Sequence, residues 1–551
     1  MRHILTYCGI AFLVINIIGC EASNKKTSSS VPQSAVNSNP AGSANQGGNV
    51  AKTQQEPPLS SSKPKEQGLD SSQEAPNGEK YRSLPENEFQ KVSSNPLSTF
   101  SIDVDTASYS NIRRFINDGQ LPPPEAVRVE EMINYFKYDY AQPAGKQPFA
   151  VTTEVATTPW NPQHRLVQIG MKSQNPGIEK LAPNNLVFLL DTSGSMNDAD
   201  KLPLLKAALR LMVNELRPTD KVSIVAYAGS AGLVLPATPG SAKAKILAAL
   251  DKLEAGGSTA GGEGIKLAYK IATDNLIKSG NNRVILATDG DFNVGISSDD
   301  ELVKLIEKQR QSNIYLSVLG FGSGNLQDSK MEQLADKGNG NYAYIDSLLE
   351  AKKVLVKELG ATLLTVAKDV KIQVEFNPAK IQAYRLIGYE NRTLQSQDFN
   401  NDKKDAGELG AGHTVTALYE IVPAGINSNA VQGNIDPLKY QNQQITQNAV
   451  KSNEIMQVKL RYKPPQTEKS QLLSYAIADQ GLQLENASNN LKFAASVTQY
   501  AMVLRNSPSK GNTNLDTILK LARQSVGSDL DGYRAEFIRL VEKTKTLQKR
   551  V

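Results

Sequence analysis

The sequence contains few of the side chains that support thiol, imidazole or zinc chemistry. Its 551 residues include only two cysteines, Cys8 and Cys20, and three histidines. Because both cysteines lie in the amino-terminal segment, the rest of the chain has no disulfide, no thiol nucleophile and no cysteine ligand for zinc. A serine hydrolase needs a histidine base, and only His164 and His413 lie beyond that segment. The sequence therefore predicts a protein that is not an enzyme.

An excess of one charge is also missing. The chain carries 61 Lys and Arg residues against 56 Asp and Glu residues, which gives a formal net charge of +5. No dense basic stretch with interleaved aromatic residues is present, so we expect no nucleic-acid partner. The length is that of two or three domains.

The amino terminus is expected to be a targeting segment rather than part of the fold. The mostly apolar run Ile4–Ile18 is too short for a good membrane span. It ends in Ile-Ile-Gly followed by Cys20, which resembles a bacterial lipobox. The resemblance implies that residues 1–19 are a lipoprotein signal peptide, that Cys20 is lipidated, and that this lipid anchors the protein to a membrane. An ordinary signal peptide and an uncleaved anchor are the alternatives.

The residues after the lipobox indicate where the protein is held. Glu21 stands where inner-membrane lipoproteins usually carry Asp, which favours the outer membrane of a bacterial cell envelope and leaves the face open. Residues 20–82 consist mainly of Ser, Asn, Gln, Lys, Pro and Gly. Such a composition cannot bury enough apolar surface to offset its ordering entropy, so the segment is predicted to be a disordered tether.

Residues 83–147 are predicted to form a small, largely helical module. A short strand at Phe100–Asp105 precedes helices at Thr106–Asn117 and Ala126–Tyr135, with Asp105 or Thr106 as the first helix cap. The sequence Asp103-Val-Asp105-Thr also resembles the opening motif of haloacid-dehalogenase-type phosphatases. No α/β domain surrounds it, so helix capping is the preferred interpretation, with a structural Ca²⁺ as the alternative.

From residue 183 to residue 360, apolar strands alternate with amphipathic helices. This pattern predicts an α/β fold, a doubly wound and mostly parallel sheet that is covered by helices on both faces. The short piece Leu233–Leu235 follows its neighbouring strand too closely for a crossover. It is therefore predicted to be an antiparallel edge strand.

The flanks of this unit read as β-structure. Residues 148–182 contain two strand patterns, and residues 361–465 contain four more. We expect one β-sandwich into which the α/β unit is inserted; a sandwich built only from residues 365–465 is the alternative. Residues 466–551 are predicted to be C-terminal helices.

Three polar loops in the α/β unit place oxygen side chains after predicted strands or before a predicted helix. The apolar run Leu186–Leu190 ends in Asp-x-Ser-x-Ser, a hydroxyl loop follows, and a second apolar run ends in Thr-Asp-Gly. In an open α/β sheet, ligands bind outside the carboxyl ends of the strands. Oxygen ligands without sulfur or imidazole suit Mg²⁺, Ca²⁺ or Mn²⁺. The candidate metal ligands are Asp191, Ser193, Ser195, Thr259 and Asp289.

These loops, in this order, resemble the metal-ion-dependent adhesion site of von Willebrand factor type A (VWA) domains. The segments Pro96–Tyr109 and Ala126–Phe136 resemble the N-terminal module of a family of bacterial VWA lipoproteins. From about residue 360 onward, the chain resembles the C-terminal domain of unknown function of the same family. The resemblance implies a doubly wound VWA (Rossmann-like) fold and a divalent cation, Mg²⁺ in first place. It also implies that hydroxyls bind the ion directly while carboxylates often act through water.

The expected function is that of an envelope-anchored lipoprotein that binds a partner protein. The partner would present an Asp or Glu side chain to an open coordination position of the metal. An assembly or regulatory scaffold of an envelope complex is the alternative, and a metal-dependent hydrolase is the least favoured. Asp198 and Asp200, close to the first loop, are predicted to be solvated surface residues, with a second metal site as the alternative. Asp291, after the third loop, is expected either to be solvated or to hydrogen-bond within the rim.

Overall fold

The computed structural model describes residues 72–74, 78–102, 105–145, 147–175, 177, 182–259, 261–290, 299–358, 364–428 and 444–549. The predicted signal peptide, Cys20 and most of the predicted tether lie outside these residues, as do Asp103 and Asp291.

The α/β unit is built on a six-stranded sheet with the order β12-β11-β10-β7-β8-β9. Its strands are β7 (Asn184–Asp191), β8 (Lys221–Tyr227), β9 (Ala231–Pro239), β10 (Asn281–Thr288), β11 (Ile314–Phe321) and β12 (Tyr342–Ile345). All neighbours are parallel except β9, which pairs antiparallel with β8 at the edge. The predicted mostly parallel sheet with an antiparallel edge strand is therefore confirmed.

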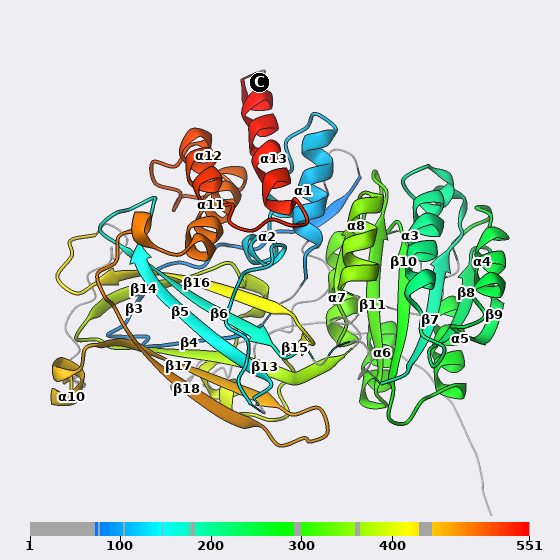
Figure 1. Ribbon diagram of the computed structural model, residues 1–551, viewed down its shortest axis with the longest axis horizontal. Coiled ribbons are helices and arrows are strands. Elements are labelled where there is room, and N and C mark those ends of the chain that lie inside the picture. Colours follow the sequence, from blue (N-terminus) through cyan, green and yellow to red (C-terminus); the bar gives the residue numbers. More distant parts are fainter. Residues whose placement is uncertain are drawn as a thin grey trace, which may run out of the picture. The chain divides into compact units, whose positions relative to one another are not determined.

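Helices cover both faces of this sheet (Figure 1). One face packs against α3 (Leu202–Glu215), α4 (Lys243–Asp251) and α8 (Leu348–Lys352), and the other against α5 (Gly261–Asp274), α6 (Asp299–Gln311) and α7 (Asp328–Lys337). Along β7, Phe188 and Leu190 face the first group whereas Val187 and Leu189 face the second. Because both faces are buried, the strand is apolar at successive positions rather than at every second one.

Two further sheets form a β-sandwich. One has the order β3-β14-β16-β6-β5, and the other has the order β15-β13-β17-β18 with β4 also paired to β13. These strands are β3 (Gln90–Lys91), β4 (Leu97–Ser101), β5 (Phe149–Thr157), β6 (Arg165–Ser173), β13 (Thr365–Phe376), β14 (Ile381–Ile387), β15 (Gly407–Gly410), β16 (Thr414–Pro423), β17 (Glu454–Lys463) and β18 (Gln471–Ala478). Strand β6 pairs with β16 from Arg165 opposite Ile421 to Lys172 opposite Thr414. The chain thus leaves the sandwich after β6, forms the α/β unit, and returns at β13.

Strand β18 corrects a prediction, because residues 471–478 were expected to be helical. The segment pairs antiparallel with β17 along its length. Leu473, Tyr475 and Ile477 pack on the sandwich core, and these alternate positions carry the period of a strand. The C-terminal helices begin only at α11 (Asn489–Leu504) and continue with α12 (Leu515–Gln524) and α13 (Tyr533–Gln548).

The amino-terminal boundary also differs from the prediction. Residues up to 82 were expected to belong to the tether, but β2 (Lys80–Arg82) pairs with β1 (Ser72–Glu74). Tyr81 and Glu79 are fully buried. The hydroxyl of Tyr81 donates to the Glu79 carboxylate at 2.6 Å. The packed part of the chain therefore starts earlier than its composition suggests.

The segment 83–147 is divided between two parts of the structure. Strand β3 belongs to one sandwich sheet and strand β4 to the other. The helices α1 (Ala107–Asn117) and α2 (Val129–Asn134) pack with α11–α13 on the outer face of the sheet that contains β16. The predicted cap of α1 is wrong, since Thr106 makes no side-chain capping bond. Asp105 instead accepts the backbone N–H of Tyr342 at 2.8 Å, which ties α1 to β12.

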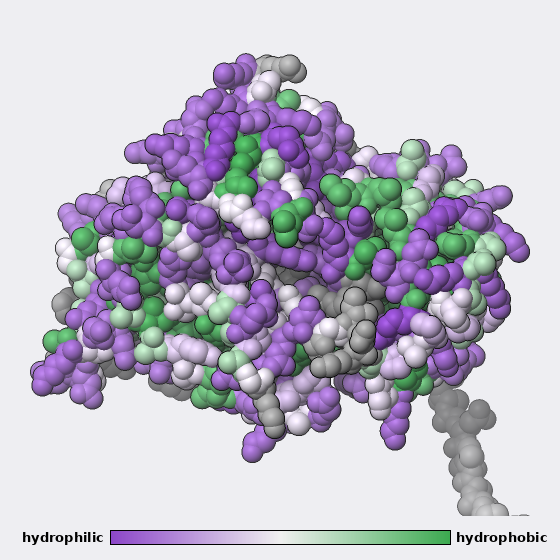
Figure 2. All heavy atoms as spheres, viewed as in Figure 1, coloured by the Kyte–Doolittle hydropathy of each residue, from purple (hydrophilic) through white to green (hydrophobic). Residues whose placement is uncertain are grey.

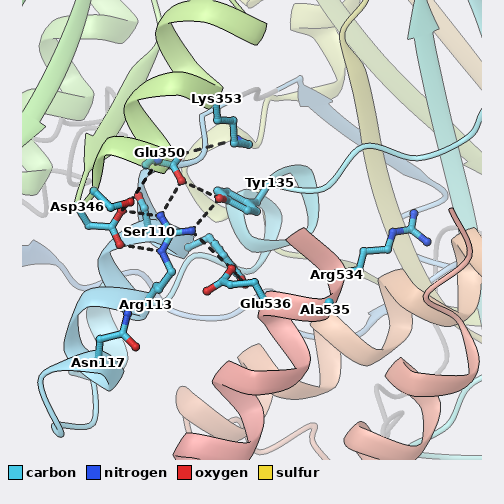
Figure 3. A network of polar contacts seen from close by, with 12 residues as sticks. Ser110, Arg113, Asn117, Tyr135, Asp346, Glu350, Lys353, Arg534, Ala535 and Glu536 are labelled. Carbon is cyan, nitrogen blue, oxygen red and sulfur yellow. Dashed lines mark hydrogen bonds and ion pairs between the residues drawn. The ribbon is translucent and has the colours of Figure 1, made fainter. Parts of the chain in front are cut away.

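A buried arginine joins this helical layer to the α/β unit (Figure 3). Arg113 of α1 donates to Asp346 after β12, and to Glu350 of α8 at 2.7 Å. It also donates to the hydroxyl of Tyr135 at 2.9 Å and lies 3.5 Å from the Glu536 carboxylate of α13. Four segments that are distant in sequence therefore meet at one guanidinium group.

The face of the molecule seen in Figure 2 is mostly hydrophilic, with hydrophobic residues in scattered groups. Two exposed leucines, Leu348 and Leu349, lie at the start of α8. Within the described ranges, no helix has both the length and the apolar character that a membrane crossing requires.

Candidate metal centre

The two aspartates of the candidate site lie at the carboxyl ends of neighbouring strands, Asp191 as the last residue of β7 and Asp289 directly after β10. Strands β7 and β10 are parallel, with Leu190 opposite Ala287, so Asp191 and Thr288 come next at the same edge and Asp289 follows one residue later. Both aspartates are fully buried. The sheet order therefore brings the first and third predicted loops to one rim, at the carboxyl ends of the strands where ligands of such sheets bind.

The two serines of the first loop lie side by side. Asp191 Oδ1 accepts the backbone N–H of Ser193 at 2.9 Å, which turns the chain directly after the strand. The buried side chain of Met196 anchors the next turn. Ser193 Oγ and Ser195 Oγ are hydrogen-bonded at 3.1 Å, and either hydroxyl can be the donor. Adjacent ligands of an octahedral ion with bonds of about 2.1 Å are about 3.0 Å apart, so this spacing and the all-oxygen donor set fit Mg²⁺.

The second loop is tied to the first by its backbone. Gly194 donates to the carbonyl of Gly257 at 3.0 Å, and Gly256 donates to the carbonyl of Thr192 at 2.8 Å. Gly257 has a φ of +84°, a conformation that glycine adopts without strain. Thr259 follows two residues later, half-buried and just before α5. All three predicted loops thus lie on the same rim.

Two residues that were not predicted hold the Asp191 carboxylate. The hydroxyls of Tyr227 and Thr288 donate to Asp191 Oδ2 at 3.1 and 3.0 Å. Burial raises the pKa of Asp191 and the nearby charge of Asp289 adds to this, while hydrogen bonds from Ser193 and Thr288 act in the opposite direction. A signal was present in the sequence, because Tyr227 and Thr288 end the two strands that flank β7.

A lysine is the other unpredicted member of the rim. Lys201 Nζ lies 3.1 Å from Asp289 Oδ2 and 3.3 Å from Asn325 Oδ1. The lysine is only 5% exposed, although it immediately precedes α3. Nothing in the local sequence distinguishes it from a surface lysine, since Asn325 comes from a loop more than a hundred positions away.

The other acidic residues near the first loop do not join the site. Asp198 and Asp200 are exposed, as predicted. In the part of the chain that the structure describes, no three His, Cys, Asp or Glu residues are grouped so that they could hold a metal ion. The candidate centre has a different donor set, two carboxylates with three hydroxyls.

A second polar cluster lies in the sandwich around His164. Its Nδ1 is 2.5 Å from Glu420 Oε1, and its Nε2 is 2.9 Å from Ser428 Oγ. The order Ser, His, Glu is that of a serine-hydrolase triad. Here, however, the imidazole is only 2% exposed, Nε2 also contacts the amide of Asn161 at 3.1 Å, and Glu420 also binds Arg385. These contacts join the turn before β6 to β16, which is a structural role.

Comparison with known proteins agrees with this architecture. Family models match in three consecutive stretches: "von Willebrand factor" over residues 75–168, "von Willebrand factor type A domain" over residues 185–358, and "Uncharacterized protein YfbK, C-terminal" over residues 361–547. The protein YfbK of Escherichia coli K12 is 46% identical over 474 residues, which cover 85% of this chain and 81% of that protein. The chain belongs to the YfbK family.

Other similarities of this YfbK-family protein are more limited. The protein sll0103 of Synechocystis is 29% identical over 187 residues, which cover 34% of this chain and 43% of that one. A solved von Willebrand factor type A protein from Catenulispora acidiphila is 17% identical and covers 71% of this chain and 89% of its own, with a TM-score of 0.39. The VWA domain of the YfbK-family chain points to a role in protein–protein interaction or as a scaffold.

Proposed function

We propose that this protein captures a partner protein through a divalent metal ion held on the rim of its VWA domain. Mg²⁺ is the preferred ion, with Ca²⁺ and Mn²⁺ as alternatives. The observation that carries the proposal is the convergence of the three loops on one rim, where Asp191 and Asp289 lie at the ends of the neighbouring parallel strands β7 and β10. Beside Asp191, Ser193 Oγ and Ser195 Oγ form a 3.1 Å hydrogen bond, a spacing that two adjacent octahedral ligands can also adopt. The residues that would hold the ion are Asp191, Ser193, Ser195, Thr259 and Asp289.

The chain's own groups would have different roles in this site. The serine and threonine hydroxyls are suited to direct coordination because they carry no charge and leave the ion strongly positive. Asp191 Oδ2 already accepts two hydrogen bonds, which favours a contact with the ion through water. A bound divalent ion supplies the positive charge that attracts an Asp or Glu side chain of the partner.

The proposed setting is the bacterial cell envelope. It rests on the lipobox-like sequence that ends at Cys20 and on the polar segment that follows it. A lipid on Cys20 and a long tether would keep the folded part near the membrane, with the outer membrane favoured, while the rim stays accessible to a protein partner. A scaffold of an envelope complex is the broader form of the same proposal, and it needs no separate site.

The first test is metal binding by the full chain. Isothermal titration with Mg²⁺ and Mn²⁺ is expected to show one site in the wild-type protein and none in Asp191→Ala or in Ser193→Ala combined with Ser195→Ala. Ser241→Ala is the matched control, since Ser241 is exposed and far from the rim. It follows the end of β9, which pairs with the start of β8, so it lies at the amino ends of the parallel strands rather than at their carboxyl ends. Unchanged metal binding in the double serine variant would refute the proposed centre.

The second test is partner capture. Chemical crosslinking in native envelopes is expected to recover a partner with the wild-type protein in Mg²⁺ and to lose it in EDTA. Restoring Mg²⁺ should restore capture by the wild-type protein but not by Asp191→Ala. Capture that persists unchanged in EDTA would contradict the metal bridge.

A further inference from the structure

The Lys201 side chain packs against Gly322 and ends at the candidate metal centre. Its stem runs past Gly322, which has a φ of +70°. A Cβ atom at Gly322 would lie 2.3 Å from Lys201 Cε and 2.4 Å from Cγ, so any other residue there would force the lysine stem to move. The Tyr344 hydroxyl donates to the Gly322 carbonyl at 2.7 Å and holds this loop in place. The ammonium group is therefore positioned by the fold.

The position of the ammonium group determines what it can do. It donates to Asp289 Oδ2 at 3.1 Å and to Asn325 Oδ1 at 3.3 Å, in a place that is almost closed to solvent. Charges that are shielded from water interact more strongly than charges on the surface. A metal ion that uses Asp289 must therefore share this carboxylate with Lys201 or displace the lysine from it.

The charges of the rim can be counted. Asp191, Asp289 and Lys201 together carry one net negative charge, and a divalent ion changes the total to one net positive charge. Without the lysine, the same ion would leave the rim neutral. A rim that is positive once the metal is bound repels further cations and attracts one carboxylate, which returns the total to zero.

We propose that Lys201 is a built-in cation that couples the metal to an anionic ligand. It weakens metal binding by the protein alone, and it makes metal binding and carboxylate binding strengthen each other. By linkage, the factor by which the carboxylate improves metal affinity equals the factor by which the metal improves carboxylate affinity. This inference rests on the proposed metal centre and adds a regulatory feature, a site that fills well only when ion and partner are both present.

The test compares Lys201→Met with the wild-type full chain. Methionine keeps an unbranched stem beside Gly322 and removes the charge. Mn²⁺ affinity is measured by isothermal titration without any carboxylate in the buffer, and again with acetate as the probe. We expect Lys201→Met to bind Mn²⁺ roughly tenfold more tightly without acetate. We also expect acetate to improve Mn²⁺ affinity less in the variant than in the wild type.

The control is Lys270→Met, which removes an exposed lysine paired with Asp274 on α5. Its Mn²⁺ affinity should match the wild type within about twofold.

Equal Mn²⁺ binding by wild type and Lys201→Met would overturn the inference but leave the metal centre intact. Weaker binding by the variant would also overturn it, because Lys201 would then act by holding Asp289 in place. No Mn²⁺ binding by either protein would refute the proposed centre itself. If Lys201→Met does not fold, Lys201→Gln gives the same comparison, since glutamine keeps a hydrogen-bond donor without the charge.

Discussion

Arg113 and Glu350 form a buried ion pair that links residues 237 positions apart, with 2.7 Å between the guanidinium nitrogen and the carboxylate oxygen. The pair joins α1, from the segment before the α/β unit, to α8, a helix within it. The nearby Asp346 and Tyr135 complete the network (Figure 3). The VWA domain is therefore attached to the helical layer by a specific polar contact as well as by apolar packing.

Arg113→Met should destabilise the protein by about 3–5 kcal/mol, because two buried carboxylates lose their shared partner. Arg113→Lys should recover only part of this loss, since one ammonium group cannot reproduce the planar set of donors. Urea unfolding followed by circular dichroism measures both variants. The control is Arg210→Met, because Arg210 pairs with Asp251 in solvent and such pairs contribute about 1 kcal/mol or less. Equal losses for Arg113→Met and Arg210→Met would contradict the role assigned to Arg113.

Thr288→Val and Tyr227→Phe each remove a hydroxyl that donates to Asp191 Oδ2. Groups that orient a ligand from behind typically change metal affinity by 10–100-fold, so each variant is expected to bind Mn²⁺ at least about tenfold more weakly. Titration calorimetry gives the affinity, and thermal unfolding shows that the fold is retained. Thr238→Val serves as the control because Thr238 is also buried but lies on β9, paired with Val222 at the far end of β8. A loss of affinity in Thr238→Val as large as in the other two would show that the effect is not local.

Gly322→Ala should destabilise the protein by about 2 kcal/mol or more. One contribution is the left-handed backbone, which costs a residue with a Cβ about 1–2 kcal/mol, and the other is the overlap with the Lys201 stem. In a Lys201→Ala background the overlap disappears, so the cost should fall toward the backbone contribution alone. A double-mutant cycle by urea unfolding measures this coupling. Gly232→Ala is the control, because nothing lies within 4 Å of a Cβ at that position. Additive effects at positions 201 and 322 would contradict the overlap of the two side chains.

Glu420→Gln should reduce the loss of stability in acid. Burial raises the pKa of Glu420, but the hydrogen bond from His164 and the charge of Arg385 outweigh burial and hold the pKa below its usual value of 4.5. A carboxyl with a lowered pKa in the folded state contributes stability above its unfolded pKa, and this contribution is lost as the pH falls through the folded pKa. The wild type should therefore exceed Glu420→Gln in stability by several kcal/mol at pH 7, where the variant would leave Arg385 with only the more distant Glu86 as a counter-ion. The difference should shrink as the pH falls below the usual pKa of 4.5. Urea midpoints between pH 7 and pH 3 test this. Glu375→Gln, at an exposed ion pair with Lys459, is the control, and a gap that stays constant with pH would contradict the linkage.

The α/β unit was the most predictable part of the protein. Its strands are apolar at successive positions and its helices repeat every three to four residues, so local pattern and final structure agree. Residues 471–478 were not recognised as a strand, although Leu473, Tyr475 and Ile477 alternate, because their inward face is defined only by pairing with β17. Asp105 was assigned to a helix cap, but its partner is the backbone of Tyr342, which a local pattern does not indicate.

The sequence by itself determined the order of strands and helices in the VWA domain, and with it the rim on which Asp191, Ser193, Ser195, Thr259 and Asp289 lie. The reason is that polar residues after neighbouring parallel strands must emerge at the same edge of the sheet. Only the tertiary structure decided what surrounds these residues. Tyr227, Thr288 and Lys201 reach the two aspartates from separate strands and loops. Tyr227 and Thr288 end the strands beside β7, so their place at the rim follows once the sheet order is known. The contact of Lys201 with Asp289 and Asn325 depends on which loops the folded chain packs together, and spacing along the sequence does not encode it.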